Sequence, residues 1–162
     1  MPVTMVRKEL RIGYDEYASV EEMSAAEREL CRAAVEALDG SYAPYSRFHV
    51  GAAVRLSDGT IVKGANQENA AFPAGLCAER SAIFAAGAQY PDVPVKTIAI
   101  AARDTTGQLT KEPVSPCGTC RQVMIETEKR FGQPIHILLY GQRCVYVIDG
   151  IRNLMPLSFT EF

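Results

Sequence analysis

The chain has 162 residues, of which 48% are hydrophobic and 22% are charged, values typical of a globular protein of one domain. Its net charge of −2 gives no electrostatic reason to bind a nucleic-acid polymer. No apolar run is long enough to span a bilayer, and the N-terminus lacks a signal-peptide core, so we expect a cytoplasmic protein without a membrane partner. Five cysteines, an odd number, argue against a disulfide framework in such a chain.

The first forty residues combine a polar lead with one well-marked helix. Within the lead, VRKELRIG (residues 6–13) has the pattern of a short edge strand. A helix is predicted over residues 23–40, because Ser24 can serve as the N-cap, Glu27 completes a capping box and Gly40 is a stop signal. Cys31 lies inside this helix among alanines and leucines, so we interpret it as a small core residue.

The rest of the chain alternates between strand and helix patterns. A hairpin signal, SDG, separates two apolar runs, and a nearly continuous apolar run at residues 95–103 indicates a central strand. The predicted strands are residues 48–56, 60–67, 95–103, 135–140 and 144–148, with helices over residues 77–89 and from about residue 116. This order predicts one mixed sheet with helices on both faces, in a single domain over residues 1–162. Residues 1–20 and the loop at 104–113 have no assigned role.

The stretch SPCGTCRQ (residues 115–122) carries the first chemical signal. Ser115 suits an N-cap and Pro116 the first helical position, so Cys117 and Cys120 are expected in the first turn. A spacing of three places both sulfurs on one helix face. The free N–H groups and the dipole of a helix N-terminus favour thiolate over thiol. Two aligned thiolates provide half of a tetrahedral zinc site.

Three interpretations of this pair are open from the residues alone. A redox dithiol needs only the CxxC spacing. A structural zinc site needs further ligands, for which the candidates Cys31, Cys144, His49 and His136 lack ligand-like spacing. A catalytic zinc site would use Cys77 as the third ligand and leave one position open for water.

The stretch GLCAERSAIFAAG (residues 75–87) favours the third interpretation. The pattern is that of a helix buried on most sides, yet Cys77, Glu79 and Arg80 stand at its start. Charged side chains are rarely buried without a partner. If Cys77 is a metal ligand, Glu79 can reach a metal-bound water without binding the metal, and can move protons between that water and a substrate nitrogen.

The segments CAERSA and PCGTCRQ, together with APYSRFHVGAAV and NQENAAFPAGLCAER, resemble the cytidine deaminase family in its small, zinc-dependent form that acts on free nucleosides. The resemblance runs from about Ser24 to Phe159. It implies a three-layer α/β/α sandwich with a mixed five-stranded sheet. It also implies one zinc ion per subunit on Cys77, Cys117 and Cys120, and hydrolysis of cytidine and 2′-deoxycytidine to uridine, 2′-deoxyuridine and ammonia in pyrimidine salvage, with Glu79 as the proton shuttle.

The resemblance also assigns residues that bind the substrate. In the family, the equivalents of Asn66 and Glu68 bind the ribose, and that of Phe48 packs on the pyrimidine ring. The backbone N–H of Ala78 and the backbone carbonyl of Ser115 match groups that read the base edge. Phe159 matches an aromatic residue that reaches into a neighbouring subunit's pocket, which implies a homotetramer with shared active sites.

Two points extend or depart from the family pattern. Three thiolates leave the zinc centre negatively charged, so we expect Arg80 and Arg121 to donate to the sulfurs and restore its acidity. Phe72 stands where many relatives have a tyrosine near the ribose, which leaves the 5′-side contact open.

Two functions are alternatives to cytidine deamination. They are deamination of another amino-heterocycle, and a zinc-stabilised binding protein without catalysis. Glu79 separates the last of these from an enzyme, because a structural site needs no proton shuttle.

Overall fold

One mixed sheet organises the chain, for which the computed structural model describes residues 3–161. Its strands lie in the order β1-β6-β5-β4-β2-β3. They are β1 (Asp15–Tyr17), β2 (His49–Leu56), β3 (Ile61–Ala65), β4 (Val95–Arg103), β5 (His136–Tyr140) and β6 (Val145–Asp149). Only the pairing of β4 with β5 is parallel within this sheet, because the helix between these two strands carries the chain back across the sheet.

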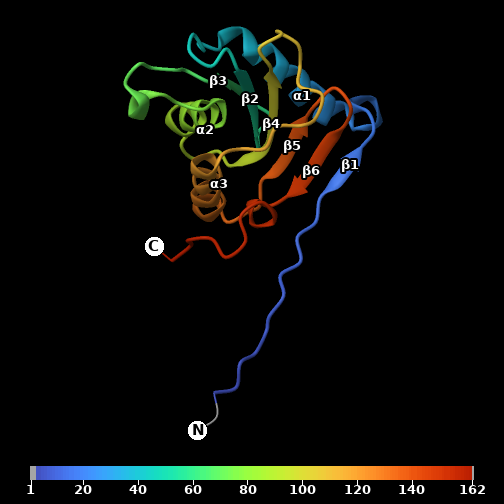
Figure 1. The fold of residues 1–162 in the computed structure, drawn as a ribbon, viewed down its shortest axis with the longest axis vertical. Coiled ribbons are helices and arrows are strands. Elements are labelled where there is room, and N and C mark those ends of the chain that lie inside the picture. The colour runs from blue at the N-terminus through green and yellow to red at the C-terminus, as the bar shows by residue number, and fades with distance from the viewer. Residues whose placement is uncertain (1–2, 162) are drawn as a thin grey trace.

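Helices cover both faces of the sheet (Figure 1). Helix α1 (Ala25–Ala37) packs on one face over the alanines of β4, whereas α2 (Ala78–Gln89) and α3 (Gly118–Phe131) pack on the other face over its isoleucines. The short 3₁₀ helices are η1 (Val20–Glu22), η2 (Leu38–Gly40), η3 (Phe72–Ala74) and η4 (Ile151–Asn153). This arrangement confirms the predicted three-layer sandwich. Within residues 3–161, no helix has the length and apolar character needed to cross a membrane.

The predicted strand count was wrong by one, because the sheet has six strands rather than five. The additional strand is β1, which forms at Asp15–Tyr17 and not in the predicted segment 6–13. It pairs antiparallel with β6 and supplies partners for an edge that would otherwise be unpaired. Three residues, two of them acidic, are too few to show an alternating pattern, so the sequence contains no clear signal for this strand.

The local signals for α1 are confirmed. The Ser24 side chain accepts a hydrogen bond from the Glu27 backbone N–H, and the Glu27 carboxylate accepts one from the Ser24 N–H at 3.0 Å. Cys31 is fully buried on the inner face of this helix, and burial raises the pKa of its thiol to about 12. Cys31 is therefore an inert core residue, as its sequence context predicts.

Two glycines let the helices approach the sheet closely. A Cβ atom on Gly64 in β3 would lie 2.3 Å from the Ala82 backbone nitrogen in α2. A Cβ atom on Gly51 in β2 would lie 2.1 Å from the Ala34 carbonyl oxygen in α1. Both contacts are with helix backbone, which cannot rotate away as a side chain can. The spacing between layers therefore depends on the absence of a side chain at these two positions.

We expect Gly64→Ala to lower the free energy of unfolding by roughly 2–3 kcal/mol or more, because the added methyl group must push α2 away from β3. Urea unfolding monitored by circular dichroism would measure the loss. Gly13→Ala is the matched control, since a Cβ atom at Gly13 would meet nothing within 4 Å. Equal stability of the two variants would contradict the close packing of α2 on β3.

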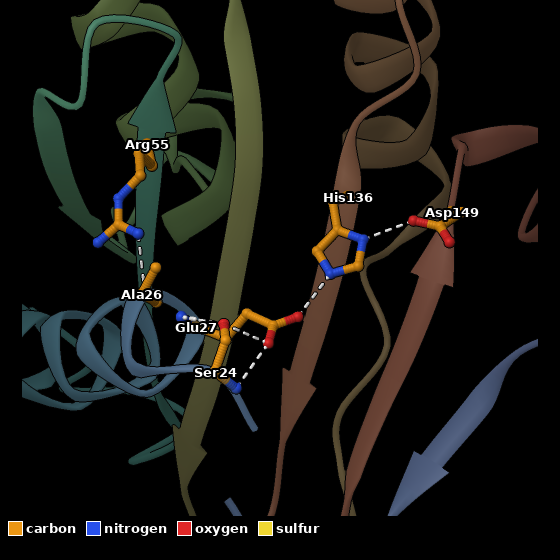
Figure 2. Close-up of polar contacts among 6 residues, drawn as sticks. All are labelled: Ser24, Ala26, Glu27, Arg55, His136 and Asp149. Atoms are coloured by element: carbon orange, nitrogen blue, oxygen red, sulfur yellow. Dashed lines mark hydrogen bonds and ion pairs between the residues drawn. The ribbon is translucent and has the colours of Figure 1, made fainter. Parts of the chain in front are cut away.

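A histidine flanked by two carboxylates joins α1 to the sheet (Figure 2). His136 Nε2 lies 2.9 Å from Glu27 Oε1, and Nδ1 lies 2.5 Å from Asp149 Oδ1. Partial burial lowers the pKa of His136, but the two carboxylates outweigh it, and the pKa is raised above its ordinary value. The Glu27 carboxylate, which also closes the capping box of α1, has a lowered pKa despite its partial burial, because it accepts hydrogen bonds from Ser24 and His136.

This cluster predicts a pH-dependent contribution to stability. Because the pKa of His136 is raised in the folded state, its contribution is complete below the unfolded pKa of about 6.5 and is lost as the pH rises through the folded value. We expect the wild type to lose about 1 kcal/mol more than His136→Asn between pH 6 and pH 8.5. Urea unfolding of both proteins at the two pH values, with zinc present throughout, measures this difference. Identical pH dependence would contradict the prediction.

Candidate active site

Two helix N-termini bring three cysteines together on one side of the sheet. Cys77 is the N-cap of α2, and Cys117 is the N-cap of α3 with its sulfur 3.5 Å from the Cys120 backbone nitrogen. The predicted start of α3 at Ser115 and Pro116 was two residues too early. In the structure Cys117 is the N-cap and Cys120 lies within the first turn, where the helix dipole stabilises thiolates.

The three sulfurs have the spacing of a metal site. Cys77 Sγ lies 3.8 Å from Cys117 Sγ, and the three sulfur atoms of Cys77, Cys117 and Cys120 all lie within 4.8 Å of one another. Zinc–sulfur bonds of about 2.3 Å in a tetrahedron require sulfurs about 3.8 Å apart, so the donor set fits zinc. Among the described residues this is the one cluster of three or more potential ligands, and it contains neither histidine. A structural site completed by Cys31, Cys144, His49 or His136 is therefore not formed.

Arg80 offsets part of the negative charge of these sulfurs. Its guanidinium donates a hydrogen bond to Cys77 Sγ at 3.3 Å. Hydrogen bonding from Cys120 and from Arg80 lowers the pKa of Cys77 to about 5, whereas the adjacent Cys77 sulfur and burial raise the pKa of Cys120. The Nε atom of Arg80 is buried and has no hydrogen-bond partner within residues 3–161.

We expected Arg121 to donate hydrogen bonds to the sulfurs, but its partners are backbone carbonyls. Its Nε donates to the Pro116 carbonyl at 2.8 Å, and its Nη1 donates to the Leu154 carbonyl. The side chain runs back toward the N-terminus of α3, so the guanidinium binds the carbonyl that precedes the cap and not the thiolates. Arg121 therefore connects the start of α3 to the C-terminal segment, and the expected donation to the sulfurs is not observed.

Glu79 is buried beside the cysteines. Only 5% of its surface is exposed, which excludes a solvated acid at a helix start. Burial raises the pKa of its carboxyl, and the nearby Cys77 sulfur raises it further. Its side chain also interacts with Cys120. A carboxyl group with a raised pKa next to a potential metal site is suited to exchange protons near neutral pH.

A pocket of about 740 Å³ opens directly onto this cluster. The expected site residues among those that line it are Asn66, Glu68, Phe72, Cys77, Arg80 and Cys117. The sequence did not point to the side chains of Tyr45, Ser46, Gln67, Asn69 and Thr119, which also line it. Tyr45 and Ser46 belong to the segment APYSRFHVGAAV, which carries part of the family resemblance but suggested no role for these two residues. The volume lies within the range of small-molecule sites.

Asn66 and Glu68 have structural contacts as well as access to the pocket. Asn66 Oδ1 accepts from the Val50 N–H at 2.8 Å and from the Ser41 hydroxyl at 2.5 Å, and its amide nitrogen donates to the Phe48 carbonyl at 2.9 Å. This network leaves one amide N–H of Asn66 for a ligand.

Glu68 holds the neighbouring turn. It accepts hydrogen bonds from the Tyr45 N–H at 2.8 Å and from the Ser46 backbone and hydroxyl. The Ser46 hydroxyl and these backbone donors lower the pKa of Glu68, so the group in the pocket is a carboxylate. Both Asn66 and Glu68 are thus rigidly held before any ligand binds.

The remaining expected residues lie at different distances from the pocket. Phe48 is half-buried and adjoins it through its carbonyl contact with Asn66. Ala78 is fully buried at the first position of α2, and Ser115 is exposed just before α3. Phe159 lies on the C-terminal segment, where its carbonyl accepts a hydrogen bond from Gln122 on α3 at 3.4 Å, and it is not among the residues that line this pocket.

A three-cysteine site that meets an open pocket through Cys77 and Cys117, with a buried carboxylate beside it, is typical of a zinc-dependent hydrolytic enzyme on an α/β/α sandwich. Residues 24–131 match the family model described as the cytidine and deoxycytidylate deaminase zinc-binding region. The chain belongs to this family, and its metal is zinc.

Individual proteins show the same relationship. The chain is 47% identical over 97 residues to a cytidine deaminase of Halalkalibacterium halodurans, a match that covers 60% of this chain and 68% of that protein. It is 40% identical over 93 residues to a cytidine deaminase of Mycobacterium tuberculosis, covering 57% of this chain and 65% of that protein. The crystal structure of cytidine deaminase from Burkholderia pseudomallei superimposes with a TM-score of 0.71 and 37% identity, over 85% of this chain and 100% of that chain. Matches to the two sequence relatives thus extend over about two thirds of their lengths.

Proposed function

We propose that this protein catalyses the zinc-dependent hydrolytic deamination of cytidine and 2′-deoxycytidine to uridine and 2′-deoxyuridine, with release of ammonia, in pyrimidine salvage. The observation that carries the proposal is the buried Glu79 beside the three-cysteine cluster, which meets the pocket through Cys77 and Cys117. A structural zinc site has no use for a buried acid with a raised pKa, whereas a deaminase requires a group that carries protons.

The zinc ion is held by Cys77, Cys117 and Cys120 in this proposal. When bound, zinc supplies a Lewis acid that lowers the pKa of a water molecule toward about 7. Glu79 accepts a proton from the water that attacks C4 of the pyrimidine and delivers it to N3. Glu79 then takes the proton of the hydroxyl group now on C4 and transfers it to the amino group, which departs as ammonia as the C4–N bond breaks and the C4 carbonyl forms. One water is consumed for each ammonia released, and no redox partner is needed.

The pocket residues bind and orient the nucleoside. Phe48 packs on the pyrimidine ring, and the Ala78 N–H and Ser115 carbonyl hydrogen-bond to the base edge. The free N–H of Asn66 and the preorganised carboxylate of Glu68 bind the ribose hydroxyls. Because both groups are already fixed by the protein, little conformational freedom is lost when they bind the sugar.

Phe72 lines the same pocket with 92% of its surface exposed. It supplies an apolar ring where many family members place a tyrosine hydroxyl. The 5′-side of the sugar therefore receives an apolar contact at this position and no hydrogen bond from Phe72. Such a ring is complementary to the carbons of the sugar rather than to its 5′-hydroxyl.

A homotetramer with shared active sites completes the proposal. Phe159 is 64% exposed on its own chain and lies outside the lining of its own pocket. An exposed aromatic ring on a terminal segment is suited to enter the pocket of a neighbouring copy. The location of the protein in the cytoplasm stays a prediction.

The direct test is to incubate the purified, zinc-loaded protein with cytidine and follow the loss of cytidine absorbance together with the release of ammonia. We expect turnover of both cytidine and 2′-deoxycytidine, and about one zinc ion per chain by metal analysis. The free base cytosine is the control, because it lacks the sugar that Asn66 and Glu68 would bind. Absence of turnover with either nucleoside would overturn the proposal, and loss of zinc without loss of turnover would overturn the metal's role.

A further inference from the structure

The N-terminal segment forms an arm that projects from the body of the protein. Residues 3–14 run as an extended chain without helix or strand and lead away from the end of β1 (Figure 1). Gly13 and Tyr14 attach its base: the Gly13 N–H donates to Asn153 Oδ1 at 3.4 Å, and the Tyr14 ring lies 4.9 Å from that of Tyr146. The rest of the arm extends away from the folded body of its own chain (Figure 1).

Apolar side chains on this arm are exposed to an unusual degree. Val3, Met5 and Val6 expose 96%, 90% and 70% of their surfaces. Leu10, Ile12 and Tyr14 are also exposed, and their spacing of two places them on one side of the extended chain. Large apolar groups gathered on one exposed segment mark an interaction surface rather than a random distribution.

The base of the arm and the C-terminal segment form one continuous surface. A groove of about 450 Å³ lies between them, with Leu10 and Ile12 on one side and Met155 and Leu157 on the other. Leu157 is almost fully exposed, and Phe159 follows two residues later. The groove thus adjoins the residue that the proposed function places in a neighbouring copy's pocket.

Charge indicates what this surface binds. Residues 1–14 contain Arg7, Lys8 and Arg11 but only one acid, Glu9, so the arm carries a net charge of +2. The whole chain has a net charge of −2, which leaves −4 on the remainder. The arm of one copy is therefore electrostatically complementary to the body of another.

From these observations we propose that the outer part of the arm, residues 3–9, crosses onto a second copy of this chain, while residues 10–14 stay attached to their own chain. The inference rests on the assembly included in the proposed function. It adds a specific role for the N-terminal segment. The apolar side chains of the arm become buried between copies, and its basic residues approach the acidic body of the partner, so the arm stabilises the assembly that supplies Phe159 to the partner's pocket.

The test compares the full-length, zinc-loaded wild type with the triple variant Val3→Ser, Met5→Ser, Val6→Ser by sedimentation velocity over a range of protein concentrations. We expect the dissociation constant of the assembly to rise at least roughly tenfold in this variant, equivalent to about 1.4 kcal/mol. The matched control is Thr4→Ser, Arg7→Lys, Glu9→Asp, which changes three arm residues but keeps the apolar side chains and the charge. It should leave the dissociation constant unchanged. Because all six positions are exposed, folding of the body should be unaffected.

A photo-crosslinking experiment supplies an independent readout. p-Benzoylphenylalanine in place of Met5, in a mixture of isotopically light and heavy chains, should give crosslinked pairs that contain one chain of each kind. An unchanged dissociation constant in the apolar triple variant, crosslinks confined to single chains, or a wild type that is monomeric at all concentrations would overturn the inference. Binding of the arm to anionic vesicles without any effect on assembly would also overturn it, and would assign the arm to a membrane.

Failure of the inference and failure of the proposed function are distinguishable. Turnover of cytidine by a protein whose assembly does not depend on the arm would leave the function standing and remove the inference. Arm-dependent assembly of a protein that does not turn over cytidine or 2′-deoxycytidine would do the opposite.

Discussion

Replacement of Glu79 by glutamine is expected to lower kcat for cytidine by roughly 10²–10⁴-fold, the range that a general acid–base group contributes. Glutamine has nearly the same shape and can occupy the same buried position, but it cannot accept a proton from water or deliver one to N3. Glu79 is not one of the three potential zinc ligands, so the zinc content should remain at the wild-type level. Steady-state kinetics with cytidine, together with metal analysis, measure both quantities.

Glu126→Gln is the matched control for this change. Glu126 lies on the exposed side of α3, so the same replacement there should leave kcat and zinc content unchanged. Turnover that survives in Glu79→Gln would show that Glu79 is not the proton carrier. Loss of zinc in Glu79→Gln would instead assign Glu79 a role in holding the metal. Thermal unfolding of both variants is the control that the fold is intact.

Removal of a cysteine from the cluster is expected to abolish zinc retention and turnover together. In Cys117→Ala and in Cys120→Ala, two sulfurs remain from a set of three. Loss of an outer partner of a ligand costs roughly 10–100-fold in metal affinity, and loss of the ligand itself should cost more. We expect zinc to fall from about one ion per chain to a level not retained on gel filtration, and the unfolding temperature to fall with it. Metal analysis and thermal unfolding, with and without added zinc, provide the measurements.

Cys144→Ala is the matched control for the cluster. Cys144 is buried like Cys120 but lies outside the group of three, near Glu112. Its replacement should reduce stability modestly through lost packing and leave zinc content and turnover intact. Full zinc content in both cluster variants would contradict the three-cysteine site. Loss of zinc in Cys144→Ala would indicate that the metal site has a different set of ligands.

Much of the fold was predictable because its signals are local. The capping box of α1 depends on Ser24 and Glu27, which lie three residues apart, so the sequence contains the whole motif. The alternation of isoleucine and alanine along β4 reflects its two buried faces, one toward α2 and α3 and the other toward α1. The metal cluster was also predictable, because two short motifs at helix starts supply all three sulfurs.

Other features depend on contacts between distant segments. β1 exists because β6 offers it a partner more than a hundred residues later in the chain, and its three residues show no strand pattern of their own. The direction of the Arg121 side chain depends on the Leu154 carbonyl, 33 residues away, which competes with the sulfurs for its guanidinium. The orientation of the Asn66 side chain also depends on long-range packing, because its amide oxygen accepts hydrogen bonds from Ser41 and from the backbone of β2.

The sequence by itself determined the family-specific chemistry of this protein: three cysteines, a glutamate two residues beyond the first of them, and the order of strands and helices that carries them. These features depend only on residue type and on short spacings, both of which can be read directly from the sequence. Only the tertiary structure decided that the sheet has six strands, that Arg80 and not Arg121 contacts a sulfur, and that the N-terminal arm leaves its own body. The physical reason is that backbone pairing, guanidinium donation and apolar exposure depend on which distant groups come within reach, and that is decided when the layers pack.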